Sequence, residues 1–460
     1  MTGNSKPARL LWVLFFSIAA VAGASPLSGA DREKSKEGGH RSPSPEFRQA
    51  KRDFQQKFRS RQPTVRAEAV RKLAEAPHAE AAELIWQAVL DDQASIVREA
   101  AIELIGSWRE ESEVSHHLLE LLSRATRKSG MDQRTYLLLR ALGPCEDTDL
   151  QGLIIGYLDE FLGTPKANQS LLHTLVDDLA REHNESAFRT LTLFTRSKFF
   201  GTNFGFRRCL LQGIVCVPGD ETIGWLIEIL PKLTGLVQFD VISYLQKATG
   251  QEYRDDVAAW KAWWLSRSED EKREPKQVPP IGVAGRRGFY GIPIGAKRVV
   301  FVLDISGSMS GDKLEAAKRE LIAAIESLTP DVFFGVVTFN RQVFVWNRTL
   351  VAANAENRRR AINSVTVQEA ARDTASYDAL EAALGLDPEA IYFVSDGAPS
   401  AGKIVPPADI VASIAGINHV RRVSIHTIGI GTNDTTAAFF GRFMRQLAEA
   451  DWGEYREVGE

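Results

Sequence analysis

Apolar positions from residue 47 to residue 267 recur every three or four residues, a spacing that gathers them on one face of an α-helix. Within this stretch, residues 65–73 align with residues 97–105 at an offset of 32, and their apolar positions coincide. Ala69 and Ala101 occupy equivalent positions, where closely packed helices need small side chains. The pattern therefore predicts an all-α region of stacked helical repeats at 47–267. An irregular helical domain that contains only two true repeats is the alternative.

The later part of this region keeps helical periodicity but loses the repeat consensus. Trp260, Trp263 and Trp264 cluster near its end, and we interpret them as a hydrophobic cap on the stack rather than a ligand site. The segments with helical periodicity are 136–142, 153–162, 171–179, 222–233 and 239–248.

The C-terminal part of the chain has a different pattern, in which short apolar runs alternate with helical periodicity. Runs of this kind, rich in β-branched and aromatic residues, predict buried strands, and the alternation predicts a mainly parallel sheet covered by helices on both faces. We therefore expect a doubly wound α/β domain at 288–460. The predicted strands are 299–303, 331–340, 342–346, 390–395, 423–430 and 453–458, and the predicted helices include 313–328 and 434–450.

The loop after the first of these strands carries three candidate metal ligands. Asp304, Ser306 and Ser308 alternate with other residues directly after the apolar run 299–303. A carboxylate and two hydroxyls are hard oxygen ligands, which suit Mg²⁺, Mn²⁺ or Ca²⁺ rather than zinc or copper. In open α/β sheets, ligands bind at the carboxyl ends of the strands, where this loop is expected. The alternative is an ordinary loop in which these side chains satisfy their own backbone.

Two more residues extend the pattern. Thr374 precedes a helical pattern, and Asp396 follows the apolar run 390–395. With Asp304-x-Ser306-x-Ser308 before them in order, they resemble the metal-ion-dependent adhesion site (MIDAS) of von Willebrand factor type A domains. The resemblance covers 288–460 and implies a Rossmann-like doubly wound fold.

The resemblance also implies a function. The five site residues would hold a divalent cation, with Mg²⁺ as the first choice and Mn²⁺ or Ca²⁺ possible, and a protein partner would fill an open coordination position with an acidic side chain. No catalytic residue and no other cofactor is implied, so we expect a binding protein rather than an enzyme. Asp373 either adds a carboxylate or is a solvated loop charge, and Arg372 either steers an acidic partner or faces water. The expected metal ligands are Asp304, Ser306, Ser308, Thr374 and Asp396.

The N-terminus predicts export. Lys6 and Arg9 precede an apolar stretch at 10–21, and the small residues 22–24 form a cleavage signature typical of a secretory signal peptide. The apolar stretch is shorter than the ~20 residues of a membrane-spanning helix, although an uncleaved anchor is the alternative. We expect a signal peptide at 1–24 and a secreted, periplasmic or cell-envelope protein with no membrane span after cleavage.

Composition divides the rest of the chain and excludes some partners. Residues 25–46 are rich in Ser, Gly, Pro and charge and are predicted to be disordered, while 268–287 is charged, contains proline and is predicted to be a linker. The net charge of −3 becomes −5 without residues 1–24, because two cations are lost. The chain has no excess of Lys and Arg that would favour binding to nucleic acid.

The cysteines do not indicate a disulfide scaffold. Cys145, Cys209 and Cys216 are few and odd in number. On one helix, Cys209 and Cys216 would lie about 10 Å apart, which is too far to bridge. We expect buried free thiols.

The helical repeats resemble HEAT-like repeats, although their period is shorter than the usual ~40 residues. Together with the C-terminal domain and the signal peptide, they give an arrangement that resembles secreted bacterial proteins. The first hypothesis is a metal-dependent protein-binding or adhesion module on a helical scaffold. The second is a structural scaffold whose repeats bind the partner while the metal only stabilises the fold, and the third is a metal-dependent hydrolase. The identity of the partner and the oligomeric state stay open.

Overall fold

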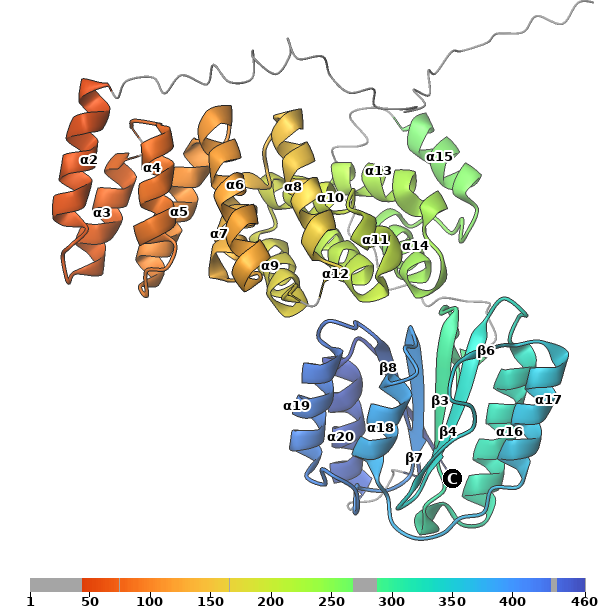
Figure 1. Cartoon of the computed structure of the whole chain (residues 1–460). Coiled ribbons are helices and arrows are strands. Elements are labelled where there is room, and N and C mark those ends of the chain that lie inside the picture. The colour runs from red at the N-terminus through yellow and green to blue at the C-terminus, as the bar shows by residue number, and fades with distance from the viewer. Residues whose placement is uncertain (1–43, 74, 165, 268–287, 432–436, 460) are drawn as a thin grey trace, which may run out of the picture.

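The computed structural model describes residues 44–73, 75–164, 166–267, 288–431 and 437–459. It contains a helical region followed by an α/β domain that lies against one side of it (Figure 1). This architecture confirms the predicted fold class. The predicted signal peptide, nearly all of the predicted disordered segment and the predicted linker lie outside the described residues.

The helical region is a stack of helices in two layers (Figure 1). In one layer α3, α5, α7, α9, α12 and α14 pack successively on one another, and in the other α4, α6, α8 and α10 do the same. The region begins with α2, two residues before the predicted start. The helices are α2 (Pro45–Lys57), α3 (Pro63–Leu73), α4 (Ala79–Leu84), η1 (Ile85–Val89), α5 (Ser95–Ser107), α6 (Ser112–Ser129), α7 (Gln133–Leu142), α8 (Thr148–Phe161), α9 (Gln169–Glu182), α10 (Glu185–Phe194), α11 (Lys198–Thr202), α12 (Phe204–Val215), α13 (Asp220–Ile229), η2 (Leu230–Lys232), α14 (Gly235–Thr249) and α15 (Val257–Ser266).

The two aligned segments of the sequence form neighbouring helices. They lie in α3 and α5, which pack side by side, and the equivalent Ala69 and Ala101 are both buried. Arg71 and Glu103, which are 32 residues apart, form an ion pair at 2.8 Å across the two helices. The helical repeats predicted from the sequence are therefore present, while their assignment to the HEAT type stays a prediction.

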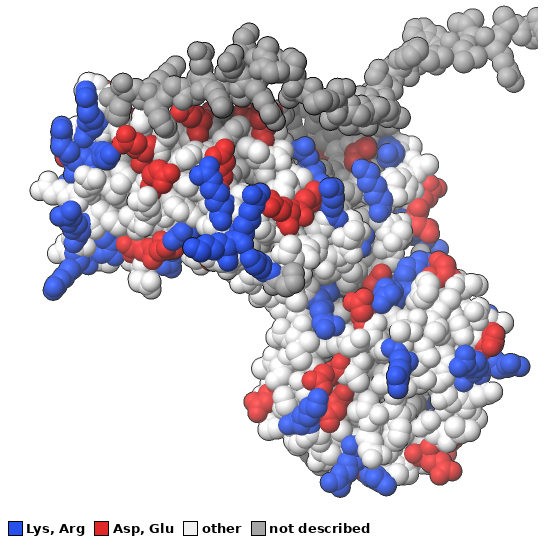
Figure 2. Space-filling model, in the orientation of Figure 1, with Lys and Arg blue, Asp and Glu red and all other residues white. Residues whose placement is uncertain are grey.

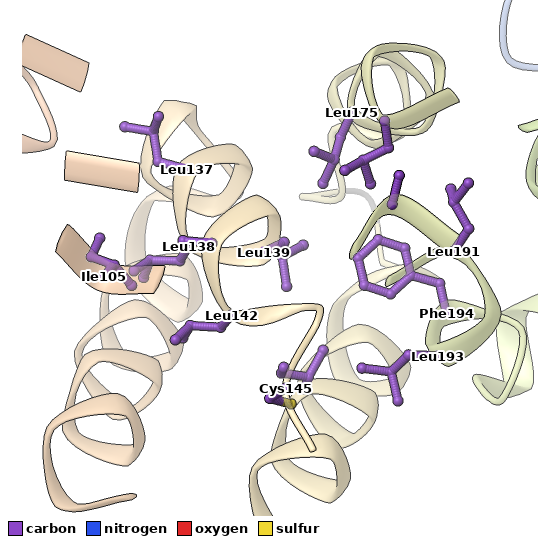
Figure 3. Packing of buried hydrophobic residues seen from close by; sticks show 14 of the residues in the cluster. Ile105, Leu137, Leu138, Leu139, Leu142, Cys145, Leu175, Leu191, Leu193 and Phe194 are labelled. Carbon is purple, nitrogen blue, oxygen red and sulfur yellow. The ribbon is translucent and has the colours of Figure 1, made fainter. Parts of the chain in front are cut away.

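The core of the stack is a single cluster of aliphatic and aromatic side chains that runs between the layers. Figure 3 shows leucines of α7 between Ile105 on α5 and the side chains of α9 and α10. At the end of the stack Trp260 is fully buried, and its indole N–H donates to the carbonyl oxygen of Arg254 at 2.9 Å. The tryptophan cluster thus packs into the end of the core, as a cap would.

Charged side chains on the outside of the stack are paired between repeats. Arg127 pairs with Glu160 at 2.9 Å, and Arg140 pairs with Glu182 at 3.0 Å. Figure 2 shows that cationic and anionic side chains are interspersed over the visible face of this region. That face therefore offers no large single-sign patch of the kind that attracts a polyanion.

The α/β domain is built on a sheet of order β5-β4-β3-β7-β8-β9, in which β3 pairs in parallel with β4 and β7, and β8 pairs in parallel with β7 and β9. The short strands β5 and β6 both pair antiparallel with β4. The strands are β3 (Arg298–Asp304), β4 (Phe333–Phe339), β5 (Val343–Val345), β6 (Val351–Ala352), β7 (Ala390–Ser395), β8 (Ser424–Ile430) and β9 (Tyr455–Val458).

Helices cover both faces of this sheet. Alternate residues of β3 enter two different cores: Phe301 packs with the helices of one face and Val302 with those of the other. This alternation arises because successive side chains of a β-strand point to opposite faces of the sheet. One face carries α16 (Asp312–Ser327) and α17 (Ala355–Thr366), and the other carries α18 (Ser376–Leu384), α19 (Pro407–Asn418) and α20 (Ala437–Ala450).

A short hairpin leads into the sheet. It consists of β1 (Gly288–Phe289) and β2 (Ile292–Pro293), and Phe289 is buried against the rings of Phe301 and Tyr392. The Tyr392 hydroxyl donates to the Pro293 carbonyl at 2.7 Å. The hairpin is therefore anchored on the sheet by an aromatic side chain and a hydrogen bond.

The thiol prediction needs one correction. Cys145 and Cys209 are buried and free, but Cys216 is exposed. The reason is its position as the residue that caps the C-terminal end of α12, where the helix leaves the core. Within the part of the chain that the structure describes, none of the helices combines the length and the apolarity needed to cross a bilayer.

The helical region and the α/β domain are joined by buried polar contacts. The Nη2 group of Arg422, just before β8, donates to both carboxylate oxygens of Asp177 on α9, at 2.9 and 2.7 Å. Arg208 on α12 donates to the Ser424 hydroxyl at 2.8 Å. The Glu389 carboxylate, just before β7, accepts the Leu236 backbone N–H of α14 at 2.9 Å. All these contacts lie at the amino ends of β7 and β8, so the carboxyl ends of the strands face away from the helical region.

We expect Arg422→Ala to lower the free energy of unfolding by about 2 kcal/mol, because Asp177 would lose its cation in a partly buried interface. The side chain of Arg422 is 4% exposed and that of Asp177 is 31% exposed. We therefore expect a smaller loss of stability than for a fully buried ion pair. Denaturant unfolding of the two proteins measures the difference. Arg127→Ala is the matched control, since its pair with Glu160 is exposed to solvent and should contribute less to the free energy of unfolding. Equal effects of the two substitutions would contradict the prediction.

Candidate metal site

The site is built around the buried carboxylate at the end of β3. Asp304 is fully buried, and its Oδ1 accepts the Ser306 backbone N–H at 2.7 Å. Its Oδ2 accepts the Ser395 hydroxyl at 2.5 Å. Because one oxygen accepts from its own loop and the other from the end of β7, the carboxylate has a fixed orientation.

The two serines lie on the loop that follows. The Oγ atoms of Ser306 and Ser308 are 3.1 Å apart, and the Ser308 hydroxyl donates to Oδ1 of Asp396 at 2.7 Å. Asp396 comes directly after β7, the parallel neighbour of β3, so the sheet brings the two loops together. Residues 88 positions apart in the chain thereby make direct contact.

The loop of Thr374 closes over the same point. The Gly307 backbone N–H donates to the Arg372 carbonyl at 2.9 Å, which ties this loop to the serine loop. A Cβ atom placed on Gly397 would lie 3.2 Å from Ser308 Oγ and 4.0 Å from Thr374 Oγ1. Gly397 thus leaves a space that the hydroxyls of two different loops border. The structure therefore gathers all five predicted residues at one edge of the sheet.

The electrostatics of the site favour an added cation. Burial raises the pKa of Asp304 to about 6, with a further increase from the nearby Asp396, while hydrogen bonds from Ser395 and Ser306 lower it. The side chain of Asp396 is 0% exposed, and Lys313 Nζ lies 3.1 Å from its Oδ2. Two buried carboxylates beside one ammonium leave a site that a divalent cation would neutralise.

The donor set fits a small hard cation. In an octahedral Mg²⁺ site with bonds of about 2.1 Å, adjacent ligand oxygens lie about 3.0 Å apart. The separation of 3.1 Å between the two serine hydroxyls is close to this value. Within the described residues, no group of three or more His, Cys, Asp and Glu side chains is suited to a metal ion, so hydroxyl oxygens have to contribute to a site here.

The two charged residues before Thr374 lie on the surface. Asp373 pairs with Arg341 at 3.8 Å, with the two side chains 50% and 68% exposed, which matches the solvated alternative for Asp373. Arg372 is exposed and has a φ of 70°, in the left-handed region that favours glycine. Its carbonyl, rather than its side chain, makes the contact with the serine loop.

Sequence reasoning missed three residues of the site. Ser395 orients Asp304, Ser400 accepts the Thr374 backbone N–H at 2.9 Å through its hydroxyl, and Lys313 pairs with Asp396. Ser395 precedes a predicted ligand directly, which was an available signal. Lys313 and Ser400 gave none, because their roles depend on how α16 and the loop after β7 meet.

Comparison with known proteins finds similarity in the α/β domain. Residues 297–457 match the family described as von Willebrand factor type A domain. The match lies within the α/β domain and does not extend to the helical region. The chain is 29% identical over 180 residues to inter-alpha-trypsin inhibitor heavy chain H4 of Homo sapiens, a match that covers 36% of this chain and 18% of the relative. It is 40% identical over 67 residues to heavy chain H3 of Bos taurus, covering 15% of this chain and 8% of the relative.

Among solved structures, the chain is similar to a von Willebrand factor type A protein from Catenulispora acidiphila. The TM-score is 0.32 and the identity 24%, and the match covers 37% of this chain and 40% of that one. The chain spans less than a fifth of the length of the two curated relatives named above.

Proposed function

We propose that this chain is a metal-dependent protein-binding protein, in which the type A domain captures an acidic side chain of a protein partner and the helical stack is its scaffold. Mg²⁺ is the cation that suits the donor set first, with Mn²⁺ and Ca²⁺ as alternatives. The chain carries out no catalysis in this proposal. The proposed ligands are Asp304, Ser306, Ser308, Thr374 and Asp396.

The observation that carries the proposal is the meeting of three loops at the carboxyl edge of the sheet. A contact links Ser308 to Asp396, and the space at Gly397 is bordered by Ser308 and Thr374. Three of the five oxygen donors are neutral hydroxyls, so a bound divalent cation would keep part of its charge to attract a carboxylate. Two hydrogen bonds hold the Asp304 carboxylate in one orientation. The position of the bound cation is therefore set by the chain itself.

The orientation of the domain supports a role in capture. The amino ends of β7 and β8 are occupied by contacts with α9, α12 and α14. The candidate metal site lies at the opposite ends of the strands, away from the helical stack. In the proposal a signal peptide at 1–24 exports the chain to the periplasm or cell envelope, where the partner is presented.

Capture from the native envelope fraction tests this function. We expect residues 25–460 to retain a partner in Mg²⁺ and to lose at least about nine-tenths of it in EDTA or after Ser306→Ala, because one metal ligand is removed. Ser327→Ala is the matched control, since Ser327 lies at the far end of α16 and its hydroxyl donates within that helix at 2.7 Å. The measurement is the amount of each retained protein, determined by quantitative mass spectrometry.

A partner that is retained equally in all of these conditions would contradict the proposal. It would instead favour the second candidate, in which the helical stack binds the partner. The observation for that candidate is a groove of about 800 Å³ beside α8, α10 and α13, whose lining includes Trp225, the cations Arg189, Arg196 and Lys232 and the carboxylate of Glu146. Charge-reversing substitutions in this groove would then remove the partner, while Ser306→Ala would not.

A further inference from the structure

Lys313 reaches into the candidate metal site from the first turn of α16. Its Nζ lies 3.1 Å from Oδ2 of Asp396, and its side chain is 28% exposed while that of Asp396 is 0% exposed. The ammonium group is therefore partly exposed to solvent, whereas the carboxylate that it contacts is shielded from solvent. The other oxygen of the same carboxylate, Oδ1, accepts the Ser308 hydroxyl.

A divalent cation in the site would compete with the Lys313 ammonium for the Asp396 carboxylate. A cation bound between Ser306, Ser308 and Asp396 would lie within a few ångströms of the ammonium, and like charges at such distances repel strongly in a partly buried site. Asp396 can be neutralised by the ammonium or by the metal, and the presence of one lowers the advantage of the other. The flexible stem of a lysine allows the ammonium to withdraw to water at little cost.

We propose that Lys313 is a built-in competitor of the metal: its ammonium holds Asp396 in the metal-free protein and is displaced when the cation binds. The inference rests on the proposed metal site and adds a control on its occupancy. Because the metal has to displace a charged group, its affinity is lower than the five ligands alone would give. Metal and partner binding are coupled because the partner's carboxylate would be a further metal ligand, and a lower affinity for the metal alone makes occupancy depend more on the partner.

The first test is the affinity for Mg²⁺ and Mn²⁺, measured by titration calorimetry on the purified chain. We expect Lys313→Gln to bind either ion about tenfold more tightly than the wild type, and Lys313→Arg, which keeps the charge, to stay within about threefold of it. Lys297→Gln is the matched control. It removes the same charge from an ion pair with Asp331 just before β4, at the amino-end edge of the sheet, and should leave the metal affinity unchanged.

The second test follows the ammonium itself. Acylation of Lys313 by an amine-specific reagent, read by peptide mass spectrometry, should become faster when Mn²⁺ is added to the wild-type protein, because the displaced ammonium becomes accessible. Lys297 serves as the internal reference and should react at the same rate with and without the metal.

The outcomes separate this inference from the proposed function. A wild-type protein that binds no divalent cation would refute the metal site itself. A wild type that binds metal while Lys313→Gln binds it equally or more weakly would leave the metal site in place and overturn the competitor role. In the latter case Lys313 would be a residue that positions Asp396 for the metal. Metal binding that leaves the acylation rate of Lys313 unchanged would also overturn displacement.

Discussion

We expect Asp304→Asn to lower the affinity for Mg²⁺ by at least about a hundredfold and, at the same time, to stabilise the metal-free protein. The loss of affinity follows from the removal of one of the two carboxylates from a site whose other donors are mostly neutral. Substitution of residues that only orient metal ligands already costs 10- to 100-fold in many sites, and Asp304 is proposed as a ligand itself.

The gain in stability follows from the burial of Asp304. Its pKa is raised from 3.8 to about 6, with burial as the largest cause. A carboxyl group whose pKa is higher in the folded than in the unfolded state favours folding when protonated, and this contribution is lost as the pH rises from about 4 to about 6. At pH 7.5 the ionised Asp304 therefore destabilises the metal-free protein, and its neutral isostere should recover about 3 kcal/mol.

Titration calorimetry and denaturant unfolding in EDTA measure the two effects. Asp387→Asn is the control, because Asp387 pairs with Arg298 at the exposed surface and its side chain is 86% exposed. Its metal affinity and its stability should both remain near those of the wild type. An Asp304→Asn variant with wild-type affinity would exclude Asp304 from the metal site. A variant less stable than the wild type in EDTA would mean that the hydrogen bonds from Ser306 and Ser395 outweigh the cost of burying the charge.

The sheet and the five proposed ligands were predictable because their signals are local. The apolar run before Asp304 specifies a buried strand, and the alternation of Asp304, Ser306 and Ser308 is read from five consecutive residues. Asp396 follows a similar run, so its place at the same edge follows from the parallel pairing of β3 and β7. The order of the strands beyond this pair required the structure.

Two helices of the α/β domain escaped prediction for different reasons. In α17, three consecutive arginines interrupt the apolar pattern, and only Ala361 and Val365 are buried. The cap was a usable signal, since the Asn354 side chain accepts the Asn357 backbone N–H. In α19, Ile410, Val411, Ile414 and Ile417 recur at helical spacing and pack on the core, so the signal was present in the sequence and was overlooked.

The interface between the two regions had no signal in the sequence. Arg422 and Asp177 are 245 residues apart, and each sits among residues that would suit a solvated surface. Nothing local distinguishes this arginine from Arg421 beside it. Contacts of this kind depend on how whole helices pack against strand ends. The spacing of residues along the sequence does not predict that packing. The same is true of Lys313, whose neighbour Asp396 is 83 residues away.

The interface also predicts a pH effect that can be assigned to one histidine. His173 on α9 is buried between Phe206 and His419, and neither of its ring nitrogens has a hydrogen-bond partner within the described residues. Burial lowers the pKa of His173 from 6.5 to about 3, and the positive charge of Arg422 contributes. The folded state therefore binds fewer protons than the unfolded state between pH 6.5 and about 3, so His173 reduces stability as the pH falls through this range.

We expect His173→Phe to become progressively more stable than the wild type below pH 6.5. The difference should grow by about 1.4 kcal/mol per pH unit, which is about 2 kcal/mol at pH 5 relative to pH 8. Denaturant unfolding of both proteins at pH 8, 6 and 5 gives the slope, and the value at pH 8 corrects for changes in packing. The comparison with wild type is essential, because burial raises the pKa values of Asp304 and Asp451 to about 6, and these carboxyls oppose the histidine over part of the range.

A second histidine provides the matched variant. Burial also lowers the pKa of His426 on β8 to about 3, and its Nδ1 accepts the Glu454 backbone N–H at 3.1 Å. His426→Phe should therefore lose stability at pH 8, because that donor is left without its partner, yet show the same dependence on pH as His173→Phe. Since the two rings lie on different elements, the slopes should add in the double variant. A stability difference between His173→Phe and wild type that stays constant from pH 8 to pH 5 would mean that His173 is protonated in the folded protein, and that the contact between α9 and the residues before β8 opens to water.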